Sequence, residues 1–265
     1  MKAGVSTACL YPQPLEECLY QLAVNGVSTV ELFVNTTSEL KKSFAHGIAD
    51  ILRRFDVDCA SLHPFTSEME TLALFSDYER RFRDSLEFHK HYFNFMNMVG
   101  AEIFVLHGAK AGVTKERYCE RFSKLYRLGK EFGITVAVEN VSRCLSASSA
   151  FISDISRMLG DEFAFVLDTK QAIRSGESPF SFVNAAGSKL CHIHISDSGQ
   201  FGDCLPIGKG SFRFEDFFKR VNDFSPDCNV ILELYRNNFD NISELIRSYN
   251  ILTSMTSRYR TEGTK

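Results

Sequence analysis

The sequence FAFVLDTKQAIRSGESPFSFVNAAGSKLCHIHIS (163–196) contains the pattern from which the fold of this protein is predicted. It begins and ends with short, nearly continuous apolar runs, FAFVLDTK (163–170) and LCHIHIS (190–196). Such runs are typical of parallel strands that are covered on both faces. The longer stretch between them is predicted to be helical. An ionisable residue, Asp168 or His194, stands near the carboxyl end of each predicted strand.

The same strand-then-helix unit repeats along the chain. Further predicted strands are KAGVSTAC (2–9), STVELFV (28–34), DCASLHP (58–64), EIFVLHGA (102–109), ITVAVEN (134–140) and NVILELY (229–235). The stretches between them carry apolar residues at helical spacing, as in Leu15, Cys18, Leu19 and Leu22. About eight such units predict an α/β fold, a (β/α)8 TIM barrel, with residues 1–265 as a single domain. An open doubly wound sheet is disfavoured because no G-x-G-x-x-G turn follows the first strand.

Composition narrows the class of protein. The 265 residues are 44% hydrophobic and carry a formal net charge of −3. The chain has no excess of basic residues, so its charge does not imply a nucleic-acid partner. No segment resembles a signal peptide or a membrane-spanning helix. The eight cysteines form no C-x-x-C pair. We therefore expect a cytoplasmic protein with reduced thiols, and the sequence leaves a homo-oligomer open.

Ionisable residues stand at or near the carboxyl ends of most predicted strands. Burying an unpaired charge is costly, and the carboxyl ends of barrel strands converge on one face, so these residues predict an active site there. Carboxylates at close quarters repel one another, and a divalent cation is the simplest group that would hold them together. The set consists of Glu31, His63, His107, Glu139, Asp168, His194 and Glu233.

Three other histidines have simpler explanations. His192, two residues before His194, is expected to be a satisfied core histidine. His89 and His91 lie in a predicted helix and are expected to be solvated or partly buried.

The long stretch SDSGQFGDCLPIGKGS (196–211) follows the seventh predicted strand and must leave the barrel at the same face. A connection of this length in a compact domain is often functional. We expect an irregular loop that helps to cover the substrate, with Lys209 reaching a hydroxyl or phosphate group. The alternative is a fixed loop whose glycines serve turns and whose Lys209 is solvated.

The strand-end residues, together with HISD (194–197) and LPIGKGSF (205–212), resemble those of the xylose-isomerase-like TIM-barrel superfamily. This superfamily includes sugar isomerases, ketose 3-epimerases of the tagatose/psicose type, inosose dehydratases and an apurinic/apyrimidinic endonuclease branch. The resemblance spans Val5 to about Leu252. It implies a mononuclear metal site made of Glu139, Asp168, His194 and Glu233. An oxygen-rich site of this kind favours Mn2+, with Mg2+, Co2+ or Zn2+ also possible.

The resemblance also implies a reaction. Glu139 and Glu233 would be the catalytic acid–base pair in an isomerase or epimerase of a small sugar, sugar phosphate or polyol ketone, through a metal-stabilised enediolate. His63 and His107 would line the substrate pocket, although in the endonuclease branch such histidines bind additional zinc ions. We further expect substrate contacts from Gln171, Arg236, Lys209 and Glu31.

Two positions depart from the family pattern. The D-x-x-H motif reads Asp168-Thr169-Lys170-Gln171, and the D-x-H element before LPIGKG reads Gly202-Asp203-Cys204, so Gln171 and Cys204 replace two histidines. Their loss argues against an endonuclease-like phosphodiesterase with three zinc ions. A keto-inositol dehydratase and a non-catalytic sugar-binding barrel are also compatible with the residues. Cys204 is expected to face the barrel mouth without being needed for metal binding.

Overall fold

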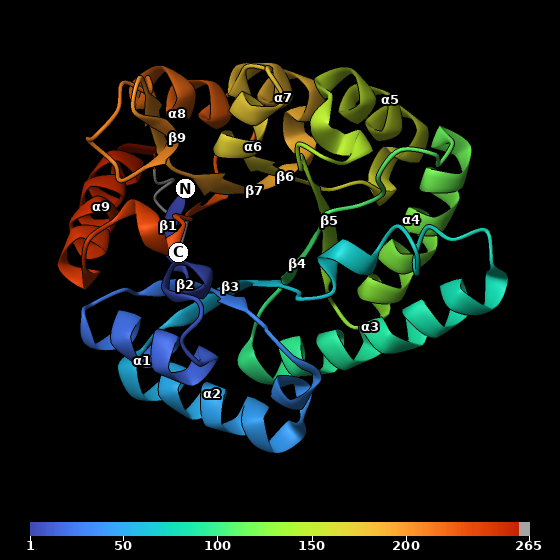
Figure 1. The fold of residues 1–265 in the computed structure, drawn as a ribbon, viewed down its shortest axis with the longest axis horizontal. Helices are drawn as coiled ribbons and strands as arrows, with labels where there is room; N and C mark the ends of the chain where they lie inside the picture. The colour runs from blue at the N-terminus through green and yellow to red at the C-terminus, as the bar shows by residue number, and fades with distance from the viewer. Residues whose placement is uncertain (260–265) are drawn as a thin grey trace, which may run out of the picture.

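Eight parallel strands close into a barrel at the centre of the molecule (Figure 1). The structure is a computed structural model and describes residues 1–259. Around the barrel the strands follow the order β1, β10, β7, β6, β5, β4, β3 and β2. Their bounds are Lys2–Ser6 (β1), Thr29–Phe33 (β2), Asp58–His63 (β3), Ile103–Leu106 (β4), Thr135–Glu139 (β5), Phe165–Asp168 (β6), Leu190–Ile195 (β7) and Asn229–Leu232 (β10). All eight predicted strands are present, and the predicted (β/α)8 barrel is confirmed.

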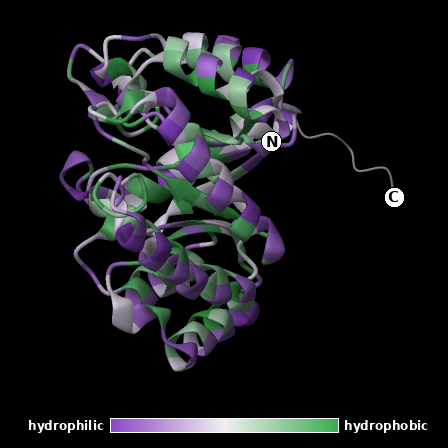
Figure 2. Ribbon diagram, turned by 90° about the vertical axis from the view of Figure 1, so that its right-hand side faces the viewer, coloured by the Kyte–Doolittle hydropathy of each residue, from purple (hydrophilic) through white to green (hydrophobic). Residues whose placement is uncertain are grey.

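Helices surround the barrel and connect successive strands (Figure 1). They are α1 (Leu15–Val24), α2 (Lys42–Phe55), α3 (Glu79–Val99), α4 (Lys115–Glu131), α5 (Ser149–Leu159), α6 (Thr169–Arg174), α7 (Pro179–Ala186), α8 (Phe214–Asn222) and α9 (Ile242–Thr256). The predicted apolar stripes are buried, as Leu15, Leu19 and Leu22 are in α1. Figure 2 shows mainly hydrophobic central strands and helices of mixed hydropathy outside them.

The strand register brings ionisable residues side by side at one end of the barrel. Asp168 on β6 pairs with His194 on β7, and His194 pairs with Ile231 on β10. Glu139 is the last residue of β5, and Glu233 directly follows β10. Residues far apart in the sequence therefore meet at the carboxyl-terminal ends of the strands, where (β/α)8 barrels carry their active sites.

The 196–211 stretch is more ordered than expected. It forms an antiparallel hairpin of β8 (Asp197–Gly199) and β9 (Gly202–Leu205) outside the barrel. The Asp197 carboxylate accepts hydrogen bonds from the backbone N–H groups of Ser198, Gly208, Gly210 and Phe212. The expectation of an irregular loop was wrong for the part that forms β8 and β9, whereas residues 206–211 contain turns and no strand. One buried carboxylate satisfies backbone donors of this second part.

Among residues 1–259, no helix is both long and apolar enough to cross a membrane. All eight cysteines are free thiols, and all but Cys191 are buried. Residues 260–265 of the predicted domain lie outside the described residues.

Candidate active site

Four of the predicted site residues form one cluster at the carboxyl-terminal ends of the strands. Each of these residues offers a ligand atom, and the four atoms lie within 4.8 Å of one another. Three of the side chains are buried, whereas the side chain of Glu233 is 14% exposed. The cluster, called the quartet below, consists of Glu139, Asp168, His194 and Glu233.

His194 is oriented by carboxylates on both sides of its ring. Its Nδ1 atom lies 3.1 Å from Glu139 Oε1 and 3.6 Å from Glu233 Oε2. Its Nε2 atom lies 3.0 Å from Glu31 Oε2. If Nε2–H donates to Glu31, the lone pair of Nδ1 faces the quartet, which is how metal-binding histidines are commonly held.

Glu31 and His192 form a buried layer beneath His194. Glu31 also accepts hydrogen bonds from the hydroxyls of Ser6 and Ser61, and it lies 3.2 Å from His192 Nε2. His192 occupies the core as expected. Glu31 is fully buried, so its contacts favour a role in positioning His194 over the direct contact with substrate that its place near a strand end suggested.

His63 and His107 lie beside the quartet and share Glu139 with it. Their Nε2 atoms are 2.9 Å apart, and His107 Nε2 lies 3.1 Å from Glu139 Oε2. The corresponding distance from His63 Nε2 is 3.8 Å. These three residues form a second group whose ligand atoms lie within 4.8 Å of one another. The two histidines therefore face the same carboxylate that the quartet uses.

Lys170 is a residue of this site that was not predicted from the sequence. It lies in the first turn of α6, and its Nζ atom forms ion pairs with the carboxylates of both Asp168 and Glu233. Its side chain is only 3% exposed. The signal was available in the DTK sequence, where a lysine follows a strand-end aspartate by two residues, but no pattern in the sequence shows that its side chain turns inward.

Asn140 is a second unforeseen contributor, since it fixes the position of Asp168. Its side-chain Nδ2 donates to the carbonyl of Asp168, and its Oδ1 accepts from the Asp168 N–H at 2.6 Å. The Asp168 carboxylate caps α6, because its Oδ1 accepts from the N–H groups of Lys170 and Gln171. Asp168 is therefore held through both its backbone and its side chain.

Three further predicted substrate contacts are engaged within the protein. Gln171 Oε1 accepts from the Ser142 N–H at 3.1 Å, and Arg236 donates to the Phe239 carbonyl at 2.9 Å. Lys209 is exposed, and its Nζ atom lies 3.7 Å from Glu244 of α9. None of the three belongs to the clustered residues, so their substrate contacts remain predictions.

Cys204 lies against the backbone of the site. It is buried on β9, with its Sγ atom 3.9 Å from the Glu233 carbonyl oxygen. Burial raises the pKa of this thiol, although Lys170 opposes the shift. Its role in metal binding remains a prediction.

The hairpin is joined to the site by Arg174. This arginine donates to both carboxylate oxygens of Asp203 on β9, at 2.5 and 2.9 Å. It also donates to the hydroxyl of Tyr235 at 2.6 Å. The Tyr235 ring centroid lies 5.7 Å from Lys170 Nζ. Helix α6, the hairpin and the segment after β10 are thereby tied together beside the quartet.

The electrostatics of the quartet follow from burial and mutual contacts. Burial favours neutral carboxyls, yet His107, His194 and His63 hold the pKa of Glu139 well below its usual range. For Asp168, burial together with Glu139 and Glu233 raises the pKa to about 7 against the opposing effect of Lys170. For His194, the surrounding carboxylates raise the pKa well above its ordinary value despite burial. Such perturbed groups in one cluster mark a functional site.

The donor set fits a divalent metal ion. It offers carboxylate oxygens from three residues and one imidazole nitrogen, a combination that suits Mn2+ and Zn2+. Glu139 Oε2 is buried and makes no hydrogen bond of acceptable geometry within residues 1–259, although His107 Nε2 and His63 Nε2 lie 3.1 and 3.8 Å from it. A buried carboxylate oxygen whose hydrogen bonding is incomplete is suited to a cation.

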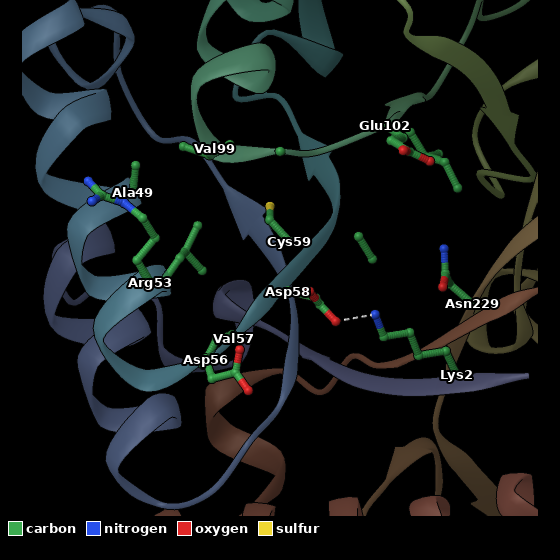
Figure 3. A pocket seen from close by; sticks show the side chains of 14 residues that line it. Lys2, Ala49, Arg53, Asp56, Val57, Asp58, Cys59, Val99, Glu102 and Asn229 are labelled. Atoms are coloured by element: carbon green, nitrogen blue, oxygen red, sulfur yellow. Dashed lines mark hydrogen bonds and ion pairs between the residues drawn. The ribbon is translucent and has the colours of Figure 1, made fainter. Parts of the chain in front are cut away.

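The amino-terminal ends of the strands, at the opposite end of the barrel, surround a cavity that is separate from the quartet. This cavity has a volume of about 520 Å³. Its lining includes Lys2, Asp58, Glu102 and Asn229, which are at or next to the first residues of four strands (Figure 3). Lys2 Nζ and the Asp58 carboxylate pair at 2.5 Å. No member of the quartet lines this cavity. Residues at this end of a barrel generally serve stability rather than catalysis.

The fold and the strand-end site together define the family. A family model described as xylose isomerase-like TIM barrel matches residues 19–252, and the chain belongs to this family. No curated protein sequence shows significant similarity to the chain.

Solved structures share the fold at low sequence identity. A D-tagatose 3-epimerase-like protein is 18% identical, with a TM-score of 0.79 and 98% of each chain covered. The IolI protein, solved with a bound zinc atom, is 17% identical with a TM-score of 0.75, covering 98% of this chain and 100% of that one. The probable 3-DHS dehydratase AsbF of Bacillus anthracis is 15% identical with a TM-score of 0.74, covering 96% and 99%.

Proposed function

We propose that this protein is a divalent-metal-dependent isomerase or epimerase of a small sugar, sugar phosphate or polyol ketone. The observation that carries the proposal is the convergence of the quartet, with four ligand atoms within 4.8 Å at the ends of four strands. Membership of the xylose isomerase-like family and the similarity in fold to a D-tagatose 3-epimerase-like protein support it.

Glu139 and Glu233 are the proposed acid–base pair. Around the barrel, β6 and β7 lie between β5, which ends in Glu139, and β10, which Glu233 follows. The two carboxylates therefore enter the quartet from strands that are not neighbours. One carboxylate would remove a proton from the carbon next to the substrate carbonyl, and the other would return a proton from the other side. A bound divalent ion would supply polarisation of the substrate oxygens next to that carbon.

Asp168 and His194 are proposed to bind the metal without exchanging protons with substrate. Asp168 is fixed by Asn140 and by the start of α6, and His194 is fixed by Glu31. Rigid ligands of this kind preserve the geometry of the site during a reaction. His63 and His107 would contact substrate hydroxyls through their ring nitrogens, beside Glu139.

The test is a substrate screen carried out in D2O with Mn2+ supplied. Free ketoses, keto-inositols and their phosphates would be followed by NMR. We expect one of them to exchange a carbon-bound proton for deuterium and to give an isomer or epimer. Loss of water from a keto-inositol would instead identify a dehydratase. Binding of a sugar without exchange or product would indicate a non-catalytic sugar-binding barrel.

A second candidate function is favoured by one observation. His63, His107 and Glu139 form a further three-residue group that could hold an additional ion, as in a metal-dependent phosphodiesterase. Gln171 and Cys204, which replace two family histidines, weigh against it. The metal content of the purified protein separates the two functions, since one ion per chain supports sugar chemistry and two or three support the phosphodiesterase.

A further inference from the structure

Lys170 brings a side-chain cation into the quartet. Its Nζ atom pairs with carboxylate oxygens of Asp168, two positions before it in the sequence, and of Glu233, which follows a different strand. At 3% exposure the ammonium is shielded from water. A buried lysine requires compensating charge, and these two carboxylates provide it.

The lysine uses the same oxygen atoms that a metal ion would need. Asp168 Oδ1 already accepts the N–H groups of Lys170 and Gln171, which leaves Oδ2 as the oxygen available to a ligand. Lys170 Nζ pairs with that Oδ2 atom and with Glu233 Oε2. Glu233 Oε2 is also the oxygen that lies 3.6 Å from His194 Nδ1, so it faces the quartet.

Coulomb repulsion makes simultaneous occupancy costly. A divalent ion bound to Asp168 Oδ2 and Glu233 Oε2 would lie within a few ångströms of the ammonium, where like charges repel strongly in a water-poor site. The ring of Tyr235 offers another place for the ammonium, since its centroid lies 5.7 Å from Nζ and a displaced cation can rest on an aromatic face.

We propose that Lys170 is the built-in cation of the metal-free site and that a divalent metal ion must displace its ammonium from Asp168 and Glu233. The inference rests on the proposed metal-dependent function and adds a control of metal affinity to it. In the metal-free protein, Lys170 neutralises the two carboxylates. In the metal-bound protein, the same carboxylates bind the ion and Lys170 moves towards Tyr235.

The experiment measures Mn2+ affinity directly. The full-length protein is stripped of metal with EDTA and titrated with Mn2+, and free Mn2+ is followed by electron paramagnetic resonance. We expect Lys170→Met and Lys170→Gln to lower the Kd for Mn2+ by roughly tenfold or more, because the competing charge is gone. Lys115→Met removes the same charge from the surface pair with Asp154 and should leave the Kd unchanged.

Thermal unfolding provides a second readout. Without metal, both Lys170 variants should unfold at a lower temperature than the wild type, because two buried carboxylates lose their partner. Saturating Mn2+ should raise their Tm by more than it raises the wild-type Tm. Lys170→Gln keeps hydrogen-bond donors to the carboxylates, so it supplies the measurement if Lys170→Met does not fold.

The outcomes separate this inference from the proposed function. Equal or weaker Mn2+ binding by both Lys170 variants, with clear binding by the wild type, would overturn the competition and leave the metal-dependent function standing. Absence of Mn2+ binding in wild type and variants alike would overturn both.

Discussion

Among single residues, Glu139 is the carboxylate on which the site converges. Its oxygens lie 3.1 Å from His107, 3.1 Å from His194 and 3.8 Å from His63. These contacts outweigh burial and hold the pKa of Glu139 well below its usual range. The residue is therefore ionised at neutral pH, the state in which a carboxylate can accept a proton or bind a metal ion.

Replacing either proposed acid–base residue should abolish most of the turnover. Glu139→Gln and Glu233→Gln keep the side-chain size but cannot accept a proton, and general acid–base catalysis contributes about 10²–10⁴-fold. We expect losses of that size in kcat on the substrate identified in the screen. The matched control is Glu131→Gln at the exposed end of α4. Activity close to wild type in either active-site variant would refute the assignment of that residue.

At the level of secondary structure, the segment that follows the β8–β9 hairpin is held against the start of β8 by Asp197 and passes close to it at Gly210. A side chain at Gly210 would collide with the Asp197 carboxylate and the Ser198 carbonyl. Lys209, by contrast, is exposed, and its Nζ atom lies 3.7 Å from Glu244. Changes at these two neighbouring positions therefore separate the path of the segment after the hairpin from the charge that this segment carries.

We expect Gly210→Ala to lower kcat/KM for every substrate by about tenfold, because a misplaced element beside a site disturbs substrate positioning. Lys209→Ala should lower kcat/KM mainly for a phosphorylated sugar, if the lysine binds phosphate as predicted. Steady-state kinetics on a free sugar and its phosphate provide the comparison. Unchanged kinetics of Lys209→Ala on both would leave Lys209 as a surface partner of Glu244.

Helix α3 contains a histidine whose burial was not foreseen. A solvated or partly buried position was expected for His89, yet the residue is 4% exposed and packs near Phe104. Burial lowers the pKa of His89 to about 4, despite its hydrogen bond with the Ser85 carbonyl. The buried stripe of α3 is wide enough to include this position, and residue type alone gave the wrong expectation.

The lowered pKa has a consequence for acid stability. A histidine in the unfolded chain takes up a proton near pH 6.5, whereas His89 in the folded protein does so only near pH 4. Between these two pH values acid therefore favours the unfolded chain. The stability that neutral His89 contributes above pH 6.5 is lost as the pH falls from 6.5 to about 4. The wild-type protein should lose unfolding free energy between pH 6.5 and pH 4, and protonation of His89 should account for up to about 3 kcal/mol of that loss. We expect the loss in His89→Phe to be smaller by this amount. Urea unfolding from pH 7 to pH 4 measures it.

The control for this prediction is His91→Phe, which changes an exposed histidine on the same helix. Its unfolding free energy should fall with acid as in the wild type. If His89→Phe showed the same acid dependence as the wild type, protonation of His89 would not contribute to acid unfolding.

Across the entire barrel, closure depends on close packing around β1. A Cβ atom at Gly4 would lie 2.6 Å from Ile231 Cδ1 and 2.7 Å from the Thr29 carbonyl oxygen. These atoms belong to β10 and β2, the two neighbours of β1. Since one of them is backbone, the barrel would have to open slightly to admit a methyl group.

Gly4→Ala should therefore lower the unfolding free energy by about 1–3 kcal/mol, the usual cost of overpacking. Gly47→Ala is the matched comparison, because nothing lies within 4 Å of a Cβ atom at this position in α2. It should raise stability by about 0.5–1 kcal/mol, since alanine favours helix more than glycine does. Denaturant unfolding of the two variants gives both values, and a neutral Gly4→Ala would show that the strands around β1 adjust freely.

The barrel and the residue types at its active end could be predicted from the amino-acid sequence. Apolar runs covered on both faces, repeated about eight times, leave few folds open, and most of these runs carry an ionisable residue near the carboxyl end. Local pattern was sufficient for the strands and for seven ionisable residues at their ends, because strand periodicity and strand ends are local properties. The resemblance to the family then implied which of them, Glu139, Asp168, His194 and Glu233, form one metal site.

The pairing of side chains within the site became evident only from the folded molecule. Lys170 lies between Asp168 and Glu233, Glu31 lies beneath His194, and Asp197 at the start of β8 binds the backbone of the segment that follows β9. Each arrangement depends on the direction of a side chain and on a partner elsewhere in the chain. Periodicity indicates which face of a helix or strand is buried. A buried charge, however, is tolerated only where a partner of opposite charge is within reach. Which charges pair is therefore set by the packing of all the strands together.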